Sequence, residues 1–348
     1  MTASSHHFAV VGAGMAGVAC ARTLVQAGHR VSVFERSAHP GGRMASVETP
    51  FGRFDSASQY FTVRDPRFAR VLKTTPELCR PWSANAVRVL DAAGRVAEVA
   101  PPTREAHWVA VPGMDALVRN WAAPLGNALL PGTQVTHLEA DALDAKRWQL
   151  RTTGEDGMGH ETTHVYSGFD AVLIATPPEV ARRLISGHST ALMQKLAAVH
   201  AAPCWTLMIA FPNANQPTLS HLGPQWNAAR STHHRVAWLA RESSKPGRDP
   251  IERWTIQASA QWSEKHLRDD PLRVRDKLLR AFSEITGIRA EPIHAQTRCW
   301  PEARTDVPAG VTHLWDARAR VGLAGDWCLG NRVEDAFVSG LSLALAVL

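Results

Sequence analysis

The sequence has little of several features that mark large classes of proteins. Its five cysteines are an odd number, stand far apart and form no CxxC pair, which argues against a disulfide framework or a zinc site. No apolar run reaches the length of a membrane-spanning helix, and no basic segment precedes the first apolar run as it would in a signal peptide. We therefore expect a cytoplasmic protein with reduced thiols, no metal site and no membrane partner.

Strong local charge is missing as well. The 348 residues include 38 Lys and Arg against 32 Asp and Glu, a net charge of +6, and the basic residues form no long run. A nucleic-acid-binding surface is therefore not expected. A modest positive field suits an anionic small molecule such as a nucleotide. With 45% hydrophobic residues the chain can bury a core, and its length suggests one large or two ordinary domains.

The start of the chain contains the clearest pattern. HFAVVGAGMAG reads as a buried strand that runs into a glycine turn, and MAGVACARTLVQAG then has helical spacing. HRVSVFE alternates like a second strand, so the three pieces form a β-α-β unit and predict a parallel sheet. The turn reads GxGxxG, in which backbone N–H groups at the helix N-terminus can bind a pyrophosphate. The residues predicted to hold it are Gly12, Gly14, Met15, Ala16 and Gly17.

Two features after this turn indicate which dinucleotide is bound. Glu35 ends the second strand and can accept hydrogen bonds from an adenosine ribose. Gly41 and Gly42 then allow close approach of the backbone, and Arg43 beside them can neutralise phosphate. This succession is the pattern of two-domain flavoproteins of the amine-oxidase and glutathione-reductase type, in which the dinucleotide is FAD. Non-covalent FAD is therefore the expected cofactor.

Beyond this unit the sequence predicts a mixture of helices and strands. We expect a helix over 66–80, a hairpin in AVRVLDAAGRVAEVA, a single strand in HVYSGFDAVLIATPP, and helices at about 271–286 and 334–348. The predicted fold class is α/β, a two-domain FAD-binding flavoprotein with a Rossmann-type parallel sheet and a second, antiparallel-sheet substrate domain. The expected limits are 1–80, 105–185 and 300–348 for the FAD-binding domain, and 81–104 and 186–299 for the substrate domain.

Three segments resemble renalase and its bacterial relatives, which belong to the flavin amine-oxidase superfamily. They are ERSAHPGGRMAS and GRFDSASQYFTVRDPRF near the start, and AGDWCLGNRVEDAFVSG near the end. FDAVLIATPP and VPGMDALV match the superfamily more loosely. Residues 190–300 match weakly, and that region is where we expect substrate specificity to lie. One departure is ASQYF, where relatives often read Gly-Ala-Gln-Tyr.

The resemblance implies further contacts with the cofactor. Glu35 and Arg36 would flank the ribose and adenine, and Val135 would pair its backbone with the adenine edge. Asp326 would bind a ribityl or phosphate oxygen. A helix that begins near Glu334 would direct its N-terminus at the flavin and stabilise the reduced anion. The residues implied to lie at the flavin ring are Ser58, Gln59, Tyr60, Val333, Glu334 and Ala336.

The same resemblance implies a reaction. Renalase-like proteins are associated with the oxidation of off-pathway dihydro isomers of NAD(P)H back to NAD(P)+. Such a substrate is already a hydride donor, because loss of hydride aromatises its ring, so binding and orientation can supply most of the catalysis. The implied activity is an FAD-dependent oxidase of 2- or 6-dihydro-NAD(P), with O2 as acceptor and H2O2 as product. Tyr60 and Trp300 are the candidate residues on the substrate side.

Two other functions stay open at this point, and the first is an FAD-dependent amine oxidase or other small-molecule oxidoreductase. An amine oxidase usually holds a neutral amine between aromatic rings, often tyrosines, and this chain has only Tyr60 and Tyr166, although it has 12 Trp. A non-catalytic flavin-binding redox sensor is the third reading. Cys328, within AGDWCLGNRVEDA, could serve as a redox thiol, but it has no partner nearby in the sequence. For most of the tryptophans in the middle region we expect ordinary packing.

Overall fold

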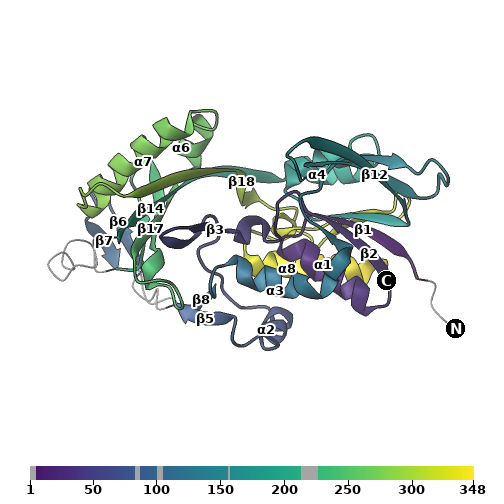
Figure 1. The fold of residues 1–348 in the computed structure, drawn as a ribbon, viewed down its shortest axis with the longest axis horizontal. Coiled ribbons are helices and arrows are strands. Elements are labelled where there is room, and N and C mark those ends of the chain that lie inside the picture. Colours follow the sequence, from purple (N-terminus) through teal and green to yellow (C-terminus); the bar gives the residue numbers. More distant parts are fainter. Residues whose placement is uncertain (1–4, 83–86, 100–104, 156, 213–225) are drawn as a thin grey trace.

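The computed structural model describes residues 5–82, 87–99, 105–155, 157–212 and 226–348. Two large sheets organise this part of the chain, one toward each end of the molecule (Figure 1). One sheet is almost entirely parallel and the other is mainly antiparallel. The predicted fold class is therefore confirmed.

The first sheet has six strands in the order β19-β20-β13-β1-β2-β9. All neighbours are parallel except the edge pair β19 and β20. The central strands are buried on both faces, as parallel strands are, because helices or a second sheet cover each side. The strands are β1 (His7–Val11), β2 (Arg30–Phe34), β9 (Leu129–Leu130), β13 (Ala171–Ile174), β19 (Leu314–Asp316) and β20 (Val321–Leu323).

Each face of the first sheet has its own hydrophobic core. Three helices share one core with it, and Figure 1 shows them side by side. They are α1 (Met15–Gln26), α3 (Asp115–Ala122) and α8 (Val333–Val347). A smaller antiparallel sheet and two helices share the other core. These are β10 (Gln134–Ala140), β11 (Trp148–Glu155), β12 (Glu161–Phe169), α4 (Pro178–Ile185) and α5 (Thr190–Leu196).

The second large sheet has seven strands in the order β18-β14-β17-β16-β15-β6-β7. Only β15 and β6 are parallel neighbours. Helices α6 (Ala260–Lys265) and α7 (Pro271–Thr286) cover one of its faces (Figure 1). The strands are β6 (Val87–Leu90), β7 (Val96–Val99), β14 (His200–Phe211), β15 (Ala228–Ser231), β16 (Val236–Arg241), β17 (Glu252–Ala258) and β18 (His294–Val307).

Shorter elements lie between the two large sheets (Figure 1). The predicted domain limit at residue 300 falls inside β18, a strand that spans from one sheet toward the other. The division of the chain into the two discontinuous domains stays a prediction. The shorter elements are β3 (Ser46–Thr49), β4 (Gly52–Asp55), α2 (Pro66–Leu72), β5 (Cys79–Trp82) and β8 (His107–Ala110).

Two local predictions were wrong. The helix expected over 66–80 ends at Leu72, because the following Thr75-Pro76 step disfavours helical backbone before the proline. The single strand expected in HVYSGFDAVLIATPP is divided into β12 and β13, which belong to different sheets. Asp170 separates the two strands, and Gly168, near the end of β12, has a positive φ of 81°, which lets the chain change direction before the break.

Within the residues that the structure describes, no helix is both long enough and apolar enough to cross a bilayer.

Candidate active site

The glycine turn after β1 leaves space in front of helix α1. Gly12 has a positive φ of 97°, which favours glycine, and a Cβ on Gly17 would overlap the backbone oxygen of Gly12. Gly14 is the N-cap of α1, and a Cβ there would meet nothing closer than the Cα of Gly42, at 3.8 Å. Gly12 and Gly17 are therefore required by packing, whereas Gly14 borders open space at the N–H groups that begin α1.

Glu35 braces this turn. Its buried carboxylate accepts hydrogen bonds from the backbone N–H groups of Ala13 and Ser37, each at 2.8 Å. Each carboxylate oxygen has a second lone pair, so Glu35 can also accept from a ribose hydroxyl. Val135 lies near the end of β2 in the same core as Phe34, whereas the side chain of Arg36 is exposed.

The GGR segment meets the far end of the chain. Arg43 Nη1 donates to Asp326 Oδ2 at 3.0 Å, and Arg43 Nη2 donates to Asp326 Oδ1. Sequence reasoning placed both residues along the cofactor but did not predict this bidentate pair. Gly41 N–H donates to Ala13 O at 3.0 Å, so the GGR segment is also attached to the glycine turn.

Helix α8 begins at Val333, as expected, but its first acidic residue is already engaged. The buried Glu334 carboxylate accepts from the backbone N–H groups of Arg64 and Asp65, at 2.7 and 3.0 Å, and so ties α8 to the start of α2. Burial raises the pKa of Cys328 to about 12. Cys328 is therefore a protonated packing residue at neutral pH, which removes the support for a redox thiol.

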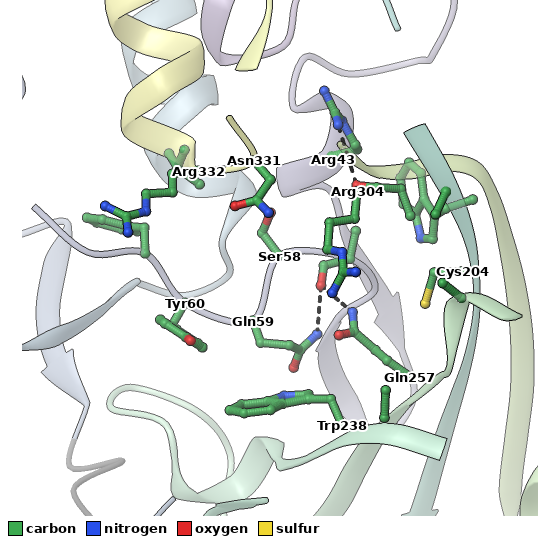
Figure 2. Close-up of a pocket in the computed structure, with 18 of the residues that line it drawn as sticks. Arg43, Ser58, Gln59, Tyr60, Cys204, Trp238, Gln257, Arg304, Asn331 and Arg332 are labelled. Carbon is green, nitrogen blue, oxygen red and sulfur yellow. Dashed lines mark hydrogen bonds between the residues drawn. The ribbon is translucent and has the colours of Figure 1, made fainter. Parts of the chain in front are cut away.

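A cavity of about 840 Å³ lies between the second large sheet, the segment from Ala57 to Arg64 and the start of α8 (Figure 2). This volume is within the range of small-molecule sites, roughly 300–1,000 Å³. Six of the residues predicted at the site line it: Arg43, Ser58, Gln59, Tyr60, Trp300 and Val333. The other predicted residues do not line this cavity. They lie at the glycine turn and the start of α1, just after β2, in the GGR segment, on β10, just after β20 and at the start of α8: Gly12, Gly14, Met15, Ala16, Gly17, Glu35, Arg36, Gly41, Gly42, Val135, Asp326, Glu334 and Ala336.

Aromatic rings form one wall of the cavity. The centroid of Tyr60 lies 4.1 Å from that of His107 and 5.8 Å from that of Trp238. Trp300 Nε1 donates to Ser56 O at 2.9 Å, so its indole is fixed against the loop that precedes Ser58. The other tryptophans considered in the middle region, Trp205, Trp254 and Trp262, pack in the core of the second sheet, as expected.

Positive charge surrounds the cavity. Among the described lining residues the only acid is Glu105, and it is paired with Arg64. The lining arginines are Arg43, Arg64, Arg230, Arg304 and Arg332. Burial, and then the charge of Arg230, lower the pKa of His107 below its ordinary value, so this imidazole is neutral at pH 7.

Sequence reasoning missed His107 and Arg230, and no motif marks either of them in the sequence. Arg230 comes beside Trp238 through strand pairing, since the two residues stand directly opposite each other across β15 and β16.

The residues present fit FAD. The open space beside Gly14 suits a pyrophosphate, Glu35 suits the ribose, and the segment from Ser58 to Tyr60 borders a cavity of about 840 Å³, which can accept a flavin ring. Ser58 N–H donates to Arg43 O at 3.0 Å, which joins that segment to the GGR turn. The described residues contain no group of three His, Cys, Asp or Glu side chains arranged to hold a metal ion.

Comparison with known proteins gives two family matches. Residues 10–75 match the NAD(P)-binding Rossmann-like domain, and residues 98–348 match the family described as flavin containing amine oxidoreductase. A putative L-amino-acid oxidase of Bacillus subtilis is 43% identical over 53 residues, which are 15% of this chain and 11% of that protein. The matched segments of the first curated relatives cover only 11 to 29% of those proteins.

Solved structures resemble the whole chain. A putative protoporphyrinogen oxidase from an Exiguobacterium species superposes with a TM-score of 0.76, at 11% identity and 99% coverage of both chains. A variant of putrescine oxidase superposes with a TM-score of 0.69, again at 11% identity and 99% coverage of both. At this identity the likeness concerns the fold alone.

Proposed function

The chain belongs to the flavin containing amine oxidoreductase family, and from this premise we propose that it oxidises a dihydronicotinamide nucleotide, a 2- or 6-dihydro isomer of NAD(P)H, with O2 as the electron acceptor. Family membership makes the protein an FAD-dependent oxidoreductase rather than a passive redox sensor. The renalase-like substrate is the finer part of the proposal. It depends on the chemistry of the cavity.

The observation that carries the proposal is the excess of guanidinium groups on the cavity wall. Five arginines face it with one carboxylate among the described residues. Guanidinium is the side-chain group best suited to phosphate, which it binds through two parallel hydrogen bonds. Four of the five are ion-paired with a carboxylate, and the positive charge that remains on the wall disfavours a cationic amine and favours a phosphate-bearing substrate.

Arg230 is the best placed of these arginines. Its guanidinium has no ion-pair partner among the described residues, whereas Arg43, Arg64, Arg304 and Arg332 each have one. It stands opposite Trp238 on the sheet, and both side chains line the cavity. An anion bound by Arg230 would therefore leave a connected ring free to lie against the aromatic wall.

The chemistry asks little of the protein beyond binding. FAD, when bound, supplies the hydride acceptor. The chain's residues orient the substrate ring, exclude water and neutralise the phosphate. Holding the ring in a near-attack geometry supplies much of the reduction in the barrier to hydride transfer. The neutral His107 presents no added positive charge to a ring that becomes cationic as it loses hydride.

The second candidate is an amine oxidase. The family match favours it, and the aromatic wall of Tyr60, His107 and Trp238 is the observation that supports it here. A neutral amine can pack between such rings. Arg230, which lines the cavity without an ion-pair partner among the described residues, makes this the weaker candidate, because its charge disfavours the protonated amine that predominates in solution.

Peroxide release from three kinds of donor separates these functions. We expect rapid H2O2 formation from 2- or 6-dihydro-NAD(P), formation slower by at least about tenfold from the matching dihydronicotinamide riboside at the same low concentration, and none from primary amines. The riboside is the matched control, because it has the same reacting ring without a phosphate. Equal rates with nucleotide and riboside would remove the role of the arginines, and rapid turnover of amines would favour the second candidate.

A further inference from the structure

Four buried ionisable side chains lie behind the cavity wall. Lys245 Nζ is 2.9 Å from Asp55 Oδ2 and 2.9 Å from Glu242 Oε1, and Arg248 Nη2 donates to Asp55 Oδ2 at 2.8 Å. The side chains of Lys245, Asp55 and Glu242 are fully buried. Burial alone would raise the pKa of Asp55, but the charges of Lys245 and Arg248 hold it below its ordinary value. The sequence gives no sign of this cluster, because its members come from two distant segments.

The cluster reaches the cavity through one side chain. The third hydrogen bond of Lys245 goes to Gln59 Oε1, at 3.1 Å. All three N–H groups of the ammonium are therefore used. Gln59 Nε2 in turn donates to Ala57 O at 3.2 Å and to Asp55 O, and Figure 2 shows this amide directed toward its own loop. Since Lys245 can only donate, it fixes which end of the amide is the oxygen.

A second amide holds the same loop. Gln257 Nε2, on β17, donates to Ala57 O at 2.6 Å (Figure 2). The backbone of residues 57–60 is thus attached to the second sheet by Gln257 and to the buried cluster by Gln59. This segment also donates from Ser58 N–H to Arg43 O, so it is connected to the GGR turn on its other side.

We propose that Lys245 is a positioning residue for the cofactor site: its ammonium orients the Gln59 amide and thereby fixes the segment 57–60 on the cavity wall. The inference rests on the proposed placement of the flavin ring beside Ser58, Gln59 and Tyr60. It does not depend on which substrate is oxidised. Lys245 itself does not line the cavity, so it acts through Gln59.

Stability alone is a poor reason for such a cluster. Taking charges out of water costs several kcal/mol per ion, and buried ion pairs are often no more stabilising than well-packed apolar residues of similar volume. What apolar residues cannot do is orient an amide. A buried ammonium with three defined acceptors determines one arrangement of the loop beside it.

The test uses variants of the full chain loaded with FAD. Lys245→Met combined with Glu242→Gln removes the donor to Gln59 and leaves Asp55 paired with Arg248, so the buried charge stays balanced. Gln59→Leu removes the amide and leaves the ions in place. Thr255→Val is the matched control, because the Thr255 hydroxyl donates to Glu242 Oε1 at 2.7 Å in the same cluster but makes no hydrogen bond with Gln59.

The readouts are the dissociation constant of FAD, the visible absorption spectrum of the bound flavin and the thermal unfolding midpoint. We expect the Lys245/Glu242 variant and Gln59→Leu each to weaken FAD binding by about tenfold and to shift the flavin spectrum alike. The combined variant should bind FAD at most about twofold more weakly than either parent variant, because both changes remove the same interaction. Thr255→Val should lower the unfolding midpoint without changing the flavin spectrum.

Two results would overturn the proposal. In one, the Lys245/Glu242 variant lowers only the unfolding midpoint while FAD binds with wild-type affinity and spectrum, as a merely structural cluster would behave. In the other, the effects of the two changes multiply in the combined variant. None of these readouts uses a substrate, so failure of the proposed oxidase activity would be seen separately, in the peroxide assay.

Discussion

An alanine at Gly14 is expected to leave the protein folded and to weaken FAD binding by at least about a hundredfold, or roughly 2.7 kcal/mol. The backbone at Gly14 has a negative φ of −77°, which alanine adopts freely, and the added Cβ would meet no atom closer than 3.8 Å. The cost to the apoprotein is about 1 kcal/mol or less, because alanine is a poorer N-cap than glycine. The methyl group would instead occupy the space where the pyrophosphate approaches the backbone.

Gly17→Ala is the matched comparison. Here the Cβ would overlap the backbone oxygen of Gly12, so α1 must move away from β1. Overpacking of this kind costs about 1–3 kcal/mol or more, and we expect a lower unfolding midpoint even without cofactor. Thermal unfolding and fluorescence titration with FAD, applied to both variants, separate the two effects. If the Gly14 variant bound FAD as tightly as the wild type, the pyrophosphate would not bind against the Gly14 backbone.

Arg230→Gln is expected to raise the KM for a dihydronicotinamide nucleotide by about 10- to 100-fold, the range of one hydrogen bond to a charged group. The KM for the riboside should change little, since it has no phosphate for Arg230 to bind. The kcat should stay near the wild-type value for both, because the contact is made equally in the ground and transition states. Initial rates with nucleotide and riboside, for each protein, measure this difference.

Arg304→Gln provides the control for Arg230. Arg304 lines the same cavity, but its guanidinium is already paired with Asp306 at 3.0 Å and is more than half exposed. We expect a change in KM of less than about threefold, as for other exposed ion pairs. An increase in KM for nucleotide and riboside alike in the Arg230 variant would mean that Arg230 shapes the cavity and does not bind phosphate.

The cofactor-binding residues could be predicted from the sequence because their motif is local. Gly12 and Gly14 lie in the turn between β1 and α1, Gly17 lies in the first turn of α1, and Glu35 directly follows the adjacent strand β2. The chemistry of a pyrophosphate cradle depends on this short stretch, so the residue order is enough to predict it. Asp326 was tied to the cofactor only by resemblance, and its pairing with Arg43 could not be read from either segment alone.

The residues of the cavity wall could not be predicted from the sequence, because they come together through long-range contacts. Arg230 faces the cavity beside Trp238 because β15 pairs with β16 in one register, and a shift of one residue would reverse its face. Gln59 meets Lys245 across 186 residues of chain. Such contacts depend on tertiary packing, and neither periodicity nor a motif encodes them. The two wrong element limits have simpler causes. Helix α2 ends at Leu72, ahead of a proline, and the strand expected over residues 164–178 divides after Gly168, and the hydrophobic periodicity indicated neither limit.

Anaerobic mixing of the FAD-loaded protein with 2- or 6-dihydro-NAD(P), followed by the flavin absorbance, tests the central claim most directly. The measurement needs no oxygen and reports hydride transfer to the flavin itself. We expect the flavin to bleach within seconds with the nucleotide and to stay oxidised with primary amines over the same time. A spectrum unchanged by the nucleotide, or bleached by the amines alone, would contradict the account.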